Sequence, residues 1–177
     1  MLARMPTDLE VMRDTPTQLM ALWRCFVLVV VRRSPTADDA AALMDALARL
    51  AERGHQHAAI VHCAVVAGAG DPPGEAARER YRVLMTDPTS ICRGSAIVIE
   101  QEGFVGAIIR SVLTSLMFLT RAVYPTRAHG SKPAAAEWLL ALLRQQGCEP
   151  ASVEELADAM QAAMVRARTA VPANATA

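Results

Sequence analysis

Segments typical of a β-strand and of an α-helix alternate along most of this chain, and this order constrains the fold more than any other feature. The strand-like segment 25–31 reads CFVLVVV, an apolar run without alternating polar residues, and 58–66 is similar. Such runs are typical of strands that are buried on both faces of a sheet. Amphipathic segments that predict helices follow each of them. The sequence therefore predicts an α/β fold with a mainly parallel sheet of four to five strands covered by helices.

Local capping signals predict where several helices begin. Thr36, with an acidic residue three positions later, approximates a capping box for the first helix. Asp71 followed by Pro72 predicts the start of the second helix, because proline is tolerated at the first helical position. Ser131 predicts the N-cap of a fourth helix, and Ser152 with Glu155 forms a further capping box ahead of a last helix.

The length of 177 residues is enough for one domain with a substantial core. Residues 1–16 mix polar and apolar side chains, which predicts a flexible N-terminal segment. Whether this segment adds an edge strand is left open. Residues 17–146 hold the α/β domain. Residues 147–170 add a C-terminal helix, and 171–177 predict a disordered tail.

Composition narrows the classes of function. The formal net charge is zero, so there is no basic surplus to neutralise the phosphates of a nucleic acid. The most apolar stretch, 104–119, is too short to span a bilayer and contains Arg110. No signal peptide is visible, so we expect a cytoplasmic protein without a transmembrane segment. Abundant alanine and a single lysine indicate a GC-rich bacterial genome.

Two patterns that resemble cofactor or metal sites are weak. The loop 68–74 has the spacing of a phosphate-binding glycine motif, but Pro72 and Pro73 lack N–H groups and Asp71 would repel phosphate. The four cysteines contain no C-x-x-C pair, which predicts reduced, buried thiols rather than a zinc site. We therefore expect no cofactor and no metal.

The order and lengths of the elements from Gln18 to Gln146 resemble the STAS domain family of anti-sigma-factor antagonists and sulfate-transporter tails. In that family the turn after the second central strand carries a Ser or Thr that a partner kinase phosphorylates. The matching segment here, Gly68 to Glu75, contains neither residue. The resemblance thus implies a STAS-like scaffold with a regulatory role but without the phosphoswitch.

A third helix, predicted over 103–122, offers a candidate docking surface. One half of this helix is apolar and predicts a core contact. The other half combines small residues, which permit close approach, with two aromatic rings that could anchor a protein partner or a second copy of the chain. These candidate partner-binding residues are Phe104, Ala107, Ser111, Thr114, Ser115 and Phe118. Alternatively, the last helix, predicted over 153–168, covers this surface within the same molecule.

A second candidate site lies where the parallel strands end. Ligands of open α/β sheets bind outside the carboxyl ends of the strands, and Arg33, Glu100 and His129 are expected at that edge. They could supply an anion contact, an acid and a base, but no nucleophile elbow, Walker motif or Ser-His-Asp order supports catalysis. We therefore expect a non-enzymatic regulatory or protein-interaction module. The alternative is a domain that binds a small molecule or lipid at this edge or under the third helix.

Overall fold

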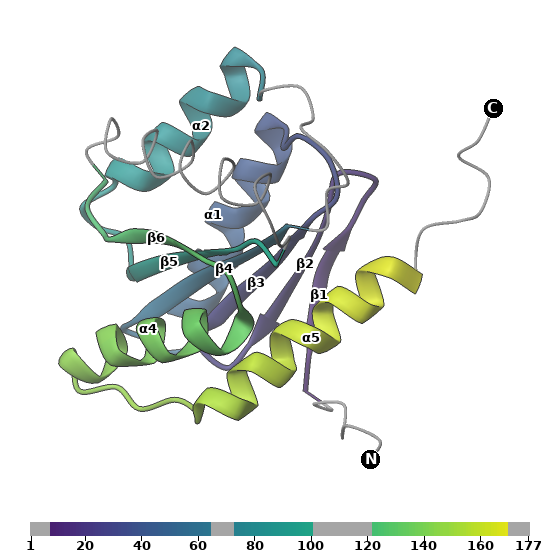
Figure 1. The fold of residues 1–177 in the computed structure, drawn as a ribbon. Helices are drawn as coiled ribbons and strands as arrows, with labels where there is room; N and C mark the ends of the chain where they lie inside the picture. Colours follow the sequence, from purple (N-terminus) through teal and green to yellow (C-terminus); the bar gives the residue numbers. More distant parts are fainter. Residues whose placement is uncertain (1–7, 65–72, 101–121, 170–177) are drawn as a thin grey trace.

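A six-stranded sheet lies between two layers of helices (Figure 1). The computed structural model describes residues 8–64, 73–100 and 122–169. The strands are β1 (Glu10–Asp14), β2 (Gln18–Trp23), β3 (Phe26–Val31), β4 (Ala58–Ala64), β5 (Cys92–Val98) and β6 (Thr126–His129). The helices are α1 (Ala37–Glu52), α2 (Glu75–Thr86), α4 (Lys132–Gln145) and α5 (Val153–Thr169).

The strands lie side by side in the order of the sequence, from β1 at one edge to β6 at the other. The pairs β1–β2 and β2–β3 are antiparallel, whereas β3, β4, β5 and β6 run parallel. The predicted mainly parallel α/β fold is confirmed, but the sheet has six strands instead of four to five. The additional strand is β1, which answers the question left open for the N-terminal segment. Its sequence, EVMRD, lacks the apolar run of a central strand because an edge strand tolerates charged side chains.

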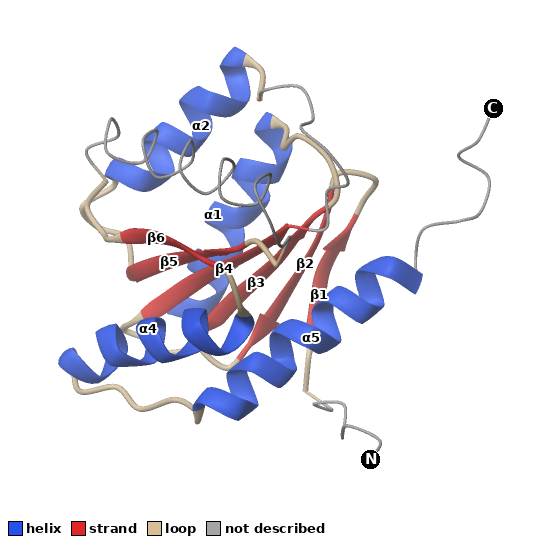
Figure 2. Ribbon diagram, in the orientation of Figure 1, coloured by secondary structure: helices blue, strands red, loops and turns tan. Residues whose placement is uncertain are grey.

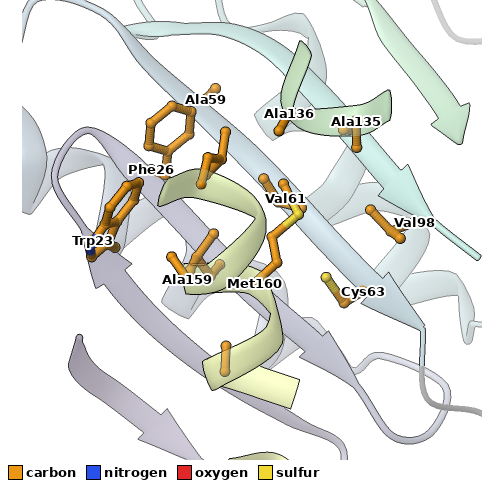
Figure 3. Close-up of a cluster of buried hydrophobic side chains, with 14 of the residues drawn as sticks. Trp23, Phe26, Ala59, Val61, Cys63, Val98, Ala135, Ala136, Ala159 and Met160 are labelled. Carbon is orange, nitrogen blue, oxygen red and sulfur yellow. The ribbon is translucent and has the colours of Figure 1, made fainter. Parts of the chain in front are cut away.

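Helices α4 and α5 cover one face of the sheet (Figure 2). Their buried side chains include many alanines, such as Ala135, Ala136, Ala159 and Ala163. Small side chains let the helices approach the strands closely. A Cβ atom built on Gly94 of β5 would lie 2.8 Å from Leu142 Cδ1 of α4, so the contact depends on glycine. In Figure 3, Ala159 and Met160 of α5 lie over the strands that form this core.

Helices α1 and α2 cover the opposite face (Figure 2). Helix α1 begins with the predicted capping box, in which Thr36 and Asp39 cap each other. Helix α2 begins at Glu75 with Gly74 as its N-cap, so the predicted start at Asp71 and Pro72 is wrong. The physical reason is the second proline, Pro73, which disfavours a helical conformation in the residue before it.

The last two helices begin where the sequence predicts. The Ser131 hydroxyl accepts a hydrogen bond from the Ala134 N–H, at 3.4 Å, at the start of α4. At the start of α5, the Glu155 N–H donates to the Ser152 hydroxyl at 3.2 Å, and the Ser152 N–H donates to the Glu155 carboxylate at 2.8 Å. This second capping box is therefore confirmed.

Candidate functional site

The predicted docking residues Phe104, Ala107, Ser111, Thr114, Ser115 and Phe118 lie within 101–121, outside the described residues. The structure nevertheless shows where α5, their proposed intramolecular cover, lies. Its apolar stripe, Leu156, Ala159, Met160 and Met164, is buried in the core that α5 shares with α4, β2 and β3. The apolar side of α5 therefore packs against the sheet and α4.

Arg33, Glu100 and His129 all lie near the carboxyl edge of the sheet, but at different strands. Arg33 follows β3, and its backbone N–H donates to the Thr17 carbonyl at 3.1 Å, on the side of the antiparallel strands. His129 ends β6, which is three strand spacings, or about 14 Å, from β3. Among the described residues, the exposed Arg33 guanidinium has no ionic partner. The strand order thus brings Glu100 and His129 to neighbouring strands and leaves Arg33 apart from both.

Glu100 forms an ion pair that the sequence reasoning missed. The Lys132 ammonium donates to Glu100 Oε1 at 2.5 Å and thereby links the end of β5 to the first residue of α4. The carboxylate therefore has a neighbouring cation as its partner. Lys132 is the single lysine of the chain, and its pairing with Glu100 depends on the fold.

His129 is buried, and its ring packs on Trp138 of α4 with 5.3 Å between the ring centroids. Burial lowers the pKa of His129, and the charge of Arg127 lowers it further, so the neutral imidazole is favoured. Its Nε2 atom is buried and has no hydrogen-bond partner in the part of the chain that the structure describes. A buried polar atom without a partner is uncommon in folded proteins and is able to bind a polar atom of a ligand or of a water molecule.

A second polar cluster lies where β1 and β2 meet the start of α1. The buried Asp39 carboxylate accepts hydrogen bonds from the Thr36 backbone N–H at 2.8 Å and from the Thr17 hydroxyl at 3.1 Å. Arg13 Nη2 lies 3.6 Å from Asp39 Oδ1. Among the described residues, the buried Arg13 Nε and Gln18 Nε2 atoms have no hydrogen-bond partner. Sequence reasoning placed Asp39 in a helix cap, but only the fold shows that it also fastens the antiparallel strands to α1.

The thiols are all free, and three of them are buried. Burial raises the pKa of Cys25, Cys63 and Cys92 to about 12, which keeps these side chains protonated near neutral pH. Burial also lowers the pKa of His62 to about 4. Within the described ranges, no three His, Cys, Asp or Glu side chains gather in a geometry that could hold a metal ion.

In the part of the chain that the structure describes, none of the helices has the length and apolar character required to cross a lipid bilayer.

Comparisons with protein families, with curated proteins and with solved structures found no match to this chain. The resemblance to the STAS family therefore stays a prediction.

Proposed function

We propose that this chain is a non-enzymatic regulatory or interaction module on a STAS-like scaffold, and that it binds a protein partner or a second copy of itself. The observation that carries the proposal is the position of α5. Its apolar stripe is buried against the sheet next to α4. Since α5 packs its apolar stripe on the sheet, the proposal assigns the predicted Phe104 and Phe118 surface to an external partner.

The state of the described side chains supports binding rather than catalysis. The high pKa of the buried Cys63 and Cys92 thiols disfavours the thiolate that nucleophilic catalysis needs. The carboxylates of Glu100 and Asp39 are engaged with Lys132 and Arg13, respectively. These groups stabilise the fold in their present arrangement.

The edge strand β1 has features that disfavour pairing with a strand of another chain. They support a partner interface formed by a helix instead. Glu10 forms ion pairs with Arg49 and Arg53 of α1, and Asp14 pairs with Arg32. The pairing register also shifts within β1. Charged side chains and an irregular register are features that prevent edge strands from pairing with other chains.

The test is native mass spectrometry on the wild-type protein and on Phe118→Glu, with thermal melting of both. We expect a dimer or a partner complex that Phe118→Glu abolishes while the melting temperature is unchanged. Val165→Glu is the matched control, because Val165 is an exposed apolar residue on α5. Unfolding of Phe118→Glu would place the ring in the core and contradict the docking surface. A monomeric wild type that retains no protein partner would contradict the proposal as a whole.

The second candidate function is binding of a small molecule or lipid at the carboxyl edge of the sheet, and the unpaired Nε2 atom of His129 favours it. Spectra recorded under native and denaturing conditions would then show an extra mass that is released on denaturation. Loss of this mass in His129→Gln would support a site between β5 and β6. Its loss in Arg33→Ala as well would mean that the ligand spans the edge from β3 to β6. A wild type without extra mass would contradict this candidate.

A further inference from the structure

Two free thiols that are far apart in the sequence lie together at one end of the α4/α5 layer. Cys25 is the second residue of the two-residue turn between β2 and β3, and it is buried in the core beneath α4 and α5. Cys148 lies in the connection between α4 and α5, is partly buried and packs against the same core. The two side chains are close enough to interact: burial raises the pKa of Cys25, and the neighbouring Cys148 thiol raises it further.

The backbone around both thiols is held in place by Arg24. This residue has φ 51°, a left-handed conformation that costs energy for a residue other than glycine. Its guanidinium donates to the Pro150 carbonyl at 2.6 Å and makes two hydrogen bonds to the Glu155 carboxylate, at 2.6 and 3.2 Å. The hairpin turn is thus fastened to Pro150 in the α4–α5 connection and to Glu155 in the first turn of α5, both on the C-terminal side of Cys148. The two thiols are positioned before any bond forms between them.

Solvent reaches this end of the molecule through an open hollow of about 570 Å³. Its lining includes Arg24 and Glu149, the chain neighbours of the two cysteines. Cys148 is partly exposed, whereas Cys25 is 1% exposed. An oxidant therefore meets Cys148 first.

We propose that Cys25 and Cys148 form a redox-sensitive pair that closes to an intramolecular disulfide on reaction with a small disulfide such as oxidised glutathione. The Cys148 thiolate attacks one glutathione sulfur, which forms a mixed disulfide and releases one glutathione thiolate. Cys25 then gives up its proton and attacks the Cys148 sulfur, which releases the second glutathione. The two cysteines lose two electrons, and the glutathione disulfide gains them. Burial raises the pKa of Cys25, so this second step is the slower one.

The product would join the β2–β3 turn covalently to the connection between α4 and α5. It would lock the C-terminal helix onto the sheet, because the hydrogen bonds from Arg24 to Pro150 and Glu155 would be backed by a covalent bond. A cross-link between residues so distant in sequence removes much conformational freedom from the unfolded chain. In a reducing compartment such bonds are typically transient and regulatory.

The test exposes the full-length, reduced protein to oxidised glutathione and follows it by intact mass, peptide mapping and thermal melting. We expect loss of two hydrogen atoms, a cross-linked peptide that contains Cys25 and Cys148, and a melting temperature higher by roughly 5–15 °C. Dithiothreitol should reverse all three changes.

The variants Cys148→Ser and Cys25→Ala should lose the cross-link, whereas Cys63→Ser should keep it. Cys63 and Cys92 cannot replace the pair, because they belong to the cores on opposite faces of the sheet. An unchanged mass, a stable glutathione adduct without closure, or a bond between two chains would each overturn the proposal. The wild-type measurements decide the outcome even if Cys25→Ala does not fold.

Discussion

The two faces of the sheet are built differently, although the same strands supply both. The α4/α5 face is filled by leucines and alanines, and both helices bury a continuous apolar stripe there. On the other face, α1 buries several leucines, but α2 buries only Ala77 and Leu84. The stripe of α2 continues into Tyr81 and Met85, which are half-buried. The comparison indicates that the α4/α5 face stabilises the fold, whereas the described part of the α1/α2 face is more loosely packed.

The polar groups are divided in the same way. The α1/α2 side holds the buried Asp39 and also Tyr124, whose hydroxyl interacts with the Cys92 thiol. On the α4/α5 side, His129 packs against Trp138, and the pair Cys25 and Cys148 lies at the end of the layer. We therefore expect truncation of core side chains to destabilise the protein most in the α4/α5 layer. Changes of charge or pH should act mainly through the α1/α2 side.

The largest difference should come from truncating one leucine in each layer. Leu143→Ala in α4 should lower the free energy of unfolding by about 3–5 kcal/mol, because the rigid layer cannot collapse around the cavity. Leu84→Ala in α2 should cost about 1–2 kcal/mol, since the half-buried neighbours can close in. Urea unfolding measures both values. Equal costs would contradict the proposed difference between the two faces.

The next effect concerns the carboxylate that fastens α1 to the antiparallel strands. Asp39→Ala should lower the free energy of unfolding by about 2–4 kcal/mol, because it leaves the Thr36 N–H and the Arg13 guanidinium without an acceptor. Asp38→Ala, an exposed neighbour, is the matched control and should cost less than about 0.5 kcal/mol. Urea unfolding again gives the comparison, and similar losses in both variants would show that Asp39 acts only as a helix-end charge.

The last difference appears only on acidification, as a dependence of stability on pH. Burial holds the pKa of His62 at about 4 in the folded protein, whereas an unfolded histidine titrates near 6.5. Between these values the unfolded chain binds a proton that the folded chain does not, so stability falls as the pH is lowered from about 6.5 to 4. One group contributes at most about 1.4 kcal/mol per pH unit. His62→Gln should flatten the slope measured by urea unfolding at several pH values, and an unaltered slope would rule His62 out as its source.

Much of the architecture followed from local sequence. The apolar run of β3 predicted a buried parallel strand, and Thr36, Ser131 and Ser152 marked the starts of three helices. These signals are readable because a cap or a strand pattern depends on residues within a few positions of each other. The start of α2 was the exception, where two adjacent prolines obscured the N-cap at Gly74.

For the candidate sites, the sequence showed only which residues lie at a strand end or on one face of a helix. It did not show which side chains they contact. The edge residues Glu100 and His129 were placed correctly at neighbouring strand ends, but the partner of Glu100, Lys132, was not foreseen. For the docking surface, the sequence left two covers open, and only the structure shows α5 packed on the sheet.

The sequence by itself determined the order of the elements, the buried character of the central strands and most of the helix starts. The tertiary structure alone decided that α5 packs next to α4, that Asp39 fastens α1 to the edge strands, and that Cys25 lies against Cys148. The reason is physical. The first group depends on interactions between near neighbours along the chain, whereas the second depends on packing that brings together residues far apart in the sequence.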